Sequence, residues 1–165
     1  MKNIKNFFSF FLKKENISVI VLIFITFSLD RFAKIKIIND YNVNVIFIND
    51  FINFNLIWNT GIGFGLLNFD STLIYNLITL LIGTVILVLL YILINSDKLD
   101  KLIFSIIVGG ALGNFYDRLS YSAVPDFIDL YYKNFHWFTF NVADIFITIG
   151  IITYIMKGYL VKKIK

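Results

Sequence analysis

The sequence predicts an α-helical integral membrane protein with four transmembrane helices and a small extracytoplasmic β-element. Of its 165 residues, 58% are hydrophobic and 16% are charged, whereas soluble domains average about 45–50% apolar and about 25% charged residues. Four apolar runs are long enough to cross about 30 Å of hydrocarbon, and basic residues gather at their flanks. We therefore expect a single membrane domain over residues 1–165.

The four predicted spans cover residues 17–38, 71–94, 99–119 and 138–156. Lysines precede the first span and follow the last, and two more, Lys98 and Lys101, lie at the short link between the second and the third and just after it. Because cytoplasmic loops carry an excess of Lys and Arg, both termini and this link are predicted to be cytoplasmic. The lysines flank apolar spans and do not line one face of a soluble domain, which argues against a nucleic-acid partner.

Between the first two spans, the spacing of apolar residues changes from the helical period of about 3.6 residues to a period of two. Apolar and polar residues alternate from Ile52 to Asn59, and Asn49-Asp50 before them is a turn signal. Such alternation is typical of a half-buried strand, so we predict an extracytoplasmic β-element over residues 43–69. The element ends in glycines at alternate positions, which let the backbone approach another surface closely; these are Gly61, Gly63 and Gly65.

Polar side chains from five separate segments gather near the predicted outer membrane face: Asp30, Asn59, Asn114, Arg118, Asp126, Asn141 and Asp144. A charge that faces hydrocarbon costs about 3 kcal/mol on insertion scales, so these groups should face protein or a wet cavity. Asp30 and Lys34 are four residues apart on one helix and can form an ion pair. Gly109 and Gly113 allow a neighbouring helix to pack closely.

Two of these carboxylates, Asp126 and Asp144, suit the activation of a water molecule for amide hydrolysis. One ionised carboxylate would take a proton from water while its protonated partner polarises the scissile carbonyl, because burial and like charge separate their titrations. The chain has no Cys and a single histidine, His136, which removes thiol nucleophiles and multi-His metal sites. We predict no metal and no other cofactor.

Two other interpretations of the carboxylates stay open at this point. Asp126 and Asp144 could be interfacial acids that cap helix starts. They could also relay protons with Asp30 in a small transporter or membrane subunit, although a relay needs carboxylates at graded depths through the bilayer. The inner half of every predicted span lacks them.

Five sequence blocks resemble the signature blocks of lipoprotein signal peptidase (signal peptidase II), a family of aspartic intramembrane peptidases. The blocks are Asp30–Lys34, Asn59–Gly65, Gly109–Arg118, Val124–Asp129 and Phe140–Asp144. The resemblance implies that Asp126 and Asp144 form the catalytic pair. It implies supporting or substrate-binding roles for Asp30, Lys34, Asn59, Gly61, Asn114, Arg118 and Asn141. The chain departs from the family pattern at Ala33, at Ile62-Gly63 and at Pro125.

The resemblance also implies a substrate and a location. The substrate would be a prolipoprotein whose lipobox cysteine carries diacylglycerol, and cleavage would fall just before that cysteine. Membrane lipid would be the other partner, with no obligate protein partner, and the active site would face outward from the bacterial cytoplasmic (inner) membrane. Rhomboid chemistry is unsupported because no G-x-S-x-G occurs, and a presenilin-like pair needs both aspartates within helices, whereas Asp126 is expected in a loop.

Overall fold

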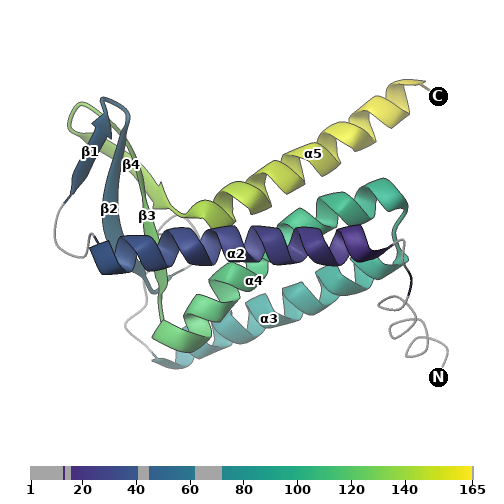
Figure 1. Ribbon diagram of the computed structural model, residues 1–165, viewed down its shortest axis with the longest axis horizontal. Coiled ribbons are helices and arrows are strands. Elements are labelled where there is room, and N and C mark those ends of the chain that lie inside the picture. Colours follow the sequence, from purple (N-terminus) through teal and green to yellow (C-terminus); the bar gives the residue numbers. More distant parts are fainter. Residues whose placement is uncertain (1–12, 14–15, 41–44, 62–71, 165) are drawn as a thin grey trace.

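The computed structural model describes residues 13, 16–40, 45–61 and 72–164. Within this part, the helices are α2 (Ile17–Asp40), α3 (Thr72–Asn95), α4 (Lys98–Tyr121) and α5 (Val142–Ile164), and the strands are β1 (Ile46–Asn49), β2 (Ile52–Asn59), β3 (Val124–Tyr132) and β4 (Phe135–Phe140). The strands form one antiparallel sheet in the order β1-β2-β3-β4. This sheet lies at one end of the helices, and the start of α2, the α3–α4 link and the end of α5 lie at the other (Figure 1).

The sheet is larger than predicted, because β3 and β4 add to the strands of the predicted β-element. The prediction of a loop at Asp126 is wrong, since this residue lies in β3 opposite Ile57 of β2. The predicted helix start at 138 is also wrong: Phe138 pairs with β3, and α5 begins only at Val142. The sequence Phe135–Phe140 is aromatic on both faces, so it favours a strand without showing the polar–apolar alternation that reveals one.

Pro125 is accommodated by its position in β3. It is the second residue of the strand, and β4 pairs with β3 only from Ile128 onward. Among the described strands, Pro125 therefore pairs with β2 alone, at a place where β3 is the edge of the sheet, and edge positions are those that tolerate proline.

Glycines allow α4 to pack closely between α2 and α5. A side chain at Gly109 would collide with Thr26 of α2, and one at Gly110 would place its Cβ 2.7 Å from the carbonyl oxygen of Ala143. At Gly113 the space is taken by the carboxylate of Asp30. The predicted close packing at Gly109 and Gly113 is confirmed, and it brings together the polar halves of α2 and α4 that lie toward the sheet (Figure 1).

Three helices of the described residues are long and apolar enough to cross a membrane, judged by length and composition: Thr72–Asn95, Lys98–Tyr121 and Val142–Leu160. Helix α2 also has 24 residues, but Asp30, Arg31 and Lys34 in its C-terminal half lower its hydropathy. Large apolar side chains on the bundle surface are widely exposed, as for Phe24 of α2 at 68% and Leu80 of α3 at 68%. A bundle with such a surface is built for an apolar surrounding.

Candidate active site

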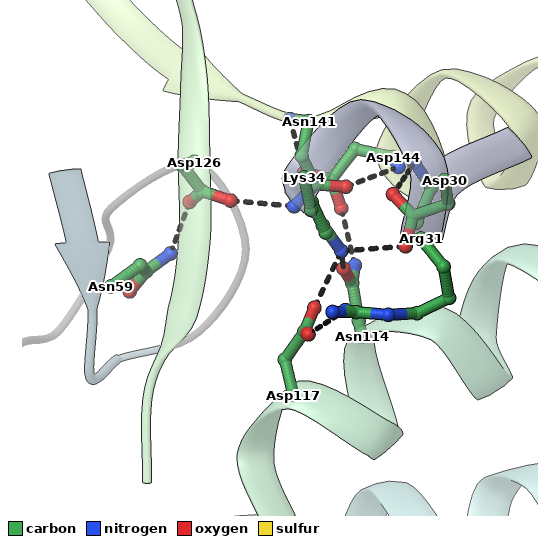
Figure 2. Close-up of polar contacts among 10 residues, drawn as sticks. Asp30, Arg31, Lys34, Asn59, Asn114, Asp117, Asp126, Asn141 and Asp144 are labelled. Atoms are coloured by element: carbon green, nitrogen blue, oxygen red, sulfur yellow. Dashed lines mark hydrogen bonds and ion pairs between the residues drawn. The ribbon is translucent and has the colours of Figure 1, made fainter. Parts of the chain in front are cut away.

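Asp126 and Asp144 are held by one shared residue, Asn141. The side-chain Nδ2 of Asn141 donates to Oδ1 of Asp126 at 2.5 Å, and its backbone N–H donates to Oδ2 of Asp144 at 3.1 Å (Figure 2). Asn141 is fully buried and Asp126 is only 2% exposed. The structure thus brings two carboxylates, one from β3 and one from α5, onto a single amide-bearing residue.

The start of α5 explains the geometry of Asn141 and Asp144. Asn141 directly precedes the helix, and its Oδ1 accepts a hydrogen bond from the backbone N–H of Asp144 at 3.1 Å. Together with the bond from the Asn141 N–H to the Asp144 carboxylate, this forms a reciprocal capping box. The positive end of the helix dipole also favours a negative charge at Asp144. Helix capping was one of the alternatives left open by the sequence, and it is observed at Asp144. The same Asn141 that forms the capping box also bonds Asp126.

The second oxygen of Asp126 is held from β2. Nδ2 of Asn59 donates to Oδ2 of Asp126 at 2.8 Å, and Oδ1 of Asn59 accepts from the backbone N–H of Gly61 at 2.8 Å. The carbonyl oxygen of Gly61 in turn accepts a hydrogen bond from Nη2 of Arg118. Three of the predicted supporting residues therefore form one chain of contacts that ends on Asp126, and Arg118 contacts a backbone carbonyl group, not a carboxylate.

The second oxygen of Asp144 is held from α4. Nδ2 of Asn114 donates to Oδ1 of Asp144 at 2.8 Å, while Oδ1 of Asn114 accepts from Nζ of Lys34 at 2.7 Å. The predicted ion pair between Lys34 and Asp30 is confirmed at 2.8 Å. Oδ1 of Asp30 also accepts from the backbone N–H of Ala143 at 2.9 Å, so α2 caps the first turn of α5.

Two members of this network were not among the predicted site residues. Asp117 accepts a hydrogen bond from Lys34 at 2.7 Å through Oδ2 and pairs with the guanidinium of Arg31 through Oδ1. The spacing of Asn114 and Asp117 was an available signal, because residues three apart share one helix face. The neighbouring position of Arg31 and Asp30 gave no such signal, since adjacent helical residues point in different directions.

The remaining sequence motifs lie elsewhere. His136 is bonded through Nδ1 to Asp129 at 2.7 Å and its ring stacks on Tyr131, so it belongs to the sheet and not to the carboxylate pair. Ile62, Gly63 and Gly65 lie outside the described residues. Within the described part of the chain, no group of three or more His, Cys, Asp or Glu side chains could hold a metal ion.

Burial and a neighbouring negative charge give Asp126 a higher pKa than that of an ordinary carboxyl group. Loss of hydration, followed by repulsion from the Asp144 charge, raises the pKa of Asp126 to about 7. The hydrogen bonds from Asn59 and Asn141 act in the opposite direction but are outweighed. A pair of carboxyl groups in which one is kept protonated at neutral pH can serve as acid and base together.

An apolar groove reaches the site from the side of α5. It has a volume of about 290 Å³ and contains Asp144 among lining residues from the sheet and from the helix: Leu130, Phe138, Phe140, Ile145, Thr148 and Ile149. Ile149 is 51% exposed, so the groove opens onto the apolar surface of the bundle. Asp144 is therefore approachable from the lipid-facing side of α5.

The fold and the site together define a helical membrane protein that holds two bridged carboxylates at one end of its bundle. The sequence profile of the family described as Signal peptidase (SPase) II matches residues 22–160. The chain therefore belongs to the signal peptidase II family, and it is a protease.

Individual relatives agree with this assignment. The chain is 46% identical over 157 residues to the lipoprotein signal peptidase of Pelagibacter ubique. The aligned region covers 93% of this chain and 89% of that relative. It is 38% identical over 135 residues to the lipoprotein signal peptidase of Solibacter usitatus, covering 75% and 79% of the two chains. The fold is similar to that of a bacterial membrane enzyme solved by the in meso method at 2.3 Å resolution, with a TM-score of 0.70, 28% identity and 89% of each chain covered.

Proposed function

We propose that this protease removes the signal peptide from diacylglyceryl-modified prolipoproteins by cleavage just before the lipidated cysteine, with Asp126 and Asp144 as its catalytic pair. The observation that carries the proposal is the bridge through Asn141, which holds both carboxylates at once. The names of the relatives, lipoprotein signal peptidases, support the class of substrate. The supporting roles of Asn59, Gly61 and Arg118 at Asp126, and of Asp30, Lys34 and Asn114 at Asp144, belong to the same proposal.

Within this proposal Asp126, whose pKa is raised to about 7, is the group that holds the shared proton, and Asp144 at the start of α5 is the anion. Asp144 begins as the anion and takes a proton from a water molecule, whose oxygen attacks the scissile carbonyl carbon. Asp126 donates its proton to the carbonyl oxygen, which gives a neutral tetrahedral intermediate. As the carbon–nitrogen bond breaks, Asp144 passes its proton to the leaving amine and Asp126 recovers one from the intermediate. Both groups thereby return to their starting states.

The membrane arrangement that fits this chemistry has α2 as a fourth span. Its charged residues are satisfied inside the protein: Lys34 and Asp30 are 0% exposed and paired with each other, and Arg31 pairs with Asp117. No lone charge of this group would face lipid, and paired, buried charges are those that membrane interiors tolerate. We infer a single membrane domain in the bacterial inner membrane, with both termini cytoplasmic and the carboxylate pair at the outer face.

The groove beside Asp144 supports a substrate that carries lipid. Its lining is apolar and it opens toward the surrounding bilayer, so a lipid-modified residue can reach the carboxylate without leaving an apolar medium. The peptide part of the substrate would approach from the side of the sheet.

A cleavage assay with a defined precursor tests the function. The purified full chain, reconstituted in liposomes, is incubated with a synthetic precursor peptide that carries a diacylglyceryl cysteine. Mass spectrometry is expected to show a free signal peptide and a product that begins with the lipidated cysteine. The same peptide with an unmodified cysteine is the matched control and is expected to stay intact. Cleavage at another bond, or equal cleavage of both peptides, would contradict the proposal.

The activity is expected to fall as the pH rises through about 7. Asp126 must hold a proton to polarise the carbonyl group, and its pKa is raised to about 7 by burial and by Asp144. Above that pH the protonated fraction falls about tenfold for each pH unit, and kcat/KM should follow it. The measurement is kcat/KM for the lipidated precursor across the pH range. A rate that stays constant up to about pH 9 would show that no such proton is needed.

A further inference from the structure

Arg31 is a buried cation that touches neither carboxylate of the proposed pair. The residue is 8% exposed, although its guanidinium carries a full charge. Its carbon Cζ lies 4.7 Å from the ring centre of Tyr116 and 5.9 Å from that of Tyr121, and the group pairs with Oδ1 of Asp117. Two aromatic faces and one carboxylate make a built site for this side chain.

Asp117 connects Arg31 to Lys34. Each oxygen of Asp117 serves a different cation, Oδ1 for Arg31 and Oδ2 for Lys34 (Figure 2). Lys34 in turn uses its ammonium group on three acceptors at once: Asp30 at 2.8 Å, Asn114 at 2.7 Å and Asp117 at 2.7 Å. An ammonium group has three donors, so Lys34 has none to spare.

Lys34 also determines which end of the Asn114 amide faces Asp144. Because the ammonium group donates to Oδ1 of Asn114, the Nδ2 end is the one that donates to Asp144 at 2.8 Å. If Lys34 left Asn114, the amide would lose the contact that fixes its orientation. A rotated amide would then present its oxygen to the carboxylate of Asp144.

The charges of this cluster balance only when Arg31 is counted. Two anions, Asp30 and Asp117, face two cations, Arg31 and Lys34, all within the packed region between α2 and α4. Without Arg31 the cluster has a net charge of −1, and among the described contacts Asp117 keeps Lys34 as its single cationic partner. The neighbouring elements carry further charged or titratable groups: Arg118 of α4, which donates to the carbonyl of Gly61, and Tyr75 of α3, which donates to the carbonyl of Arg118. In the sheet, Asp129 and His136 are bonded to each other.

We propose that Arg31 is a positioning residue for the reaction: by pairing with Asp117 it balances the charge of the cluster in which Lys34 holds the amide of Asn114 against Asp144. The proposal rests on the proposed function, because it concerns the pair that performs it. Arg31 acts through three intervening side chains and does not touch the substrate.

The test is the pH dependence of cleavage by the variant Arg31→Gln. Loss of the positive charge makes protons easier to bind at the carboxylate pair, so the fall of kcat/KM near pH 7 is expected to move to higher pH. At a charge separation of about 10 Å and an effective dielectric constant of about 20, the shift is about one pH unit, less where water screens it. The variant Arg31→Lys keeps the charge and is expected to keep the wild-type profile.

Two further variants separate positioning from stability. Lys36→Gln removes a positive charge from an exposed position of the same helix and is expected to leave the profile unmoved. Arg31→Gln combined with Asp117→Asn restores the charge balance and is expected to return the fall of kcat/KM toward its wild-type pH.

An Arg31→Gln variant that loses rate equally at every pH, or that keeps the wild-type profile, would overturn the proposal. A Lys36→Gln shift of equal size would do the same. If neither Arg31→Gln nor the double variant can be isolated folded while Arg31→Lys is active, Arg31 serves stability alone and the proposal is wrong. Failure of the wild-type protein to cut the lipidated precursor would instead contradict the proposed function.

Discussion

Replacing Asp144 by Asn abolishes cleavage of the lipidated precursor, with an expected loss of about 10³-fold or more, and Asp126→Asn does the same. An amide cannot take a proton from water and cannot supply one to the carbonyl oxygen. The hydrogen-bond donors around Asp126 also disfavour an amide at that position. Both oxygens of Asp126 accept from amide groups, of Asn59 and Asn141, so an amide nitrogen at that position would face another donor.

The measurement is the initial rate of precursor cleavage at equal amounts of inserted protein. Because the two residues act as one unit, the double variant is expected to be no slower than the slower single variant. Asp129→Asn is the matched control: it makes the same change at a buried aspartate of β3 that is bonded to His136, outside the pair. It is expected to retain activity. Near-wild-type cleavage by either Asp126→Asn or Asp144→Asn would remove the pair from the mechanism.

The local part of the site could be predicted from the sequence. Asn141 and Asp144 are three residues apart at the start of an apolar run, which is the spacing of a capping box, and Asp30 and Lys34 have the spacing of a helical ion pair. Both local pairs are present in the structure. Their geometry depends only on the helix in which they lie.

The contacts between elements could not be predicted in the same way. That Asn114 donates to Asp144, or that Asp30 caps α5 through Ala143, depends on how closely α2, α4 and α5 pack. The glycines of α4 indicated close packing but not which neighbour lies on which face. In the structure Gly113 makes room for Asp30 and Gly110 for Ala143.

The second pair of strands was missed for a different reason. β3 carries Pro125, which argues against a central strand, and β4 is aromatic on both faces. A strand without alternation has no period to detect. The consequence for the site is direct, because β3 is the element that positions Asp126 between Asn59 of β2 and Asn141.

The variant Lys34→Met is expected to destabilise the protein by about 3–5 kcal/mol, the usual cost of removing one partner of a buried ion pair. Methionine fills much of the space of the lysine stem but donates no hydrogen bond. Asp30 and Asp117 each lose a charged donor and Asn114 loses the contact to its oxygen, and both aspartates are 0% exposed. Asp117 keeps Arg31, whereas Asp30 keeps only the backbone N–H of Ala143.

The measurement is the free energy of unfolding in mixed micelles, with Lys36→Met as a control that removes an exposed lysine from the same helix. The control is expected to change stability by less than about 0.5 kcal/mol. Adding Asp30→Asn to Lys34→Met removes the uncompensated negative charge, so the double variant should recover part of the loss. The two residues contact each other, and their effects should therefore not add. A Lys34→Met protein as stable as the wild type would mean that the buried carboxylates do not depend on this ammonium group.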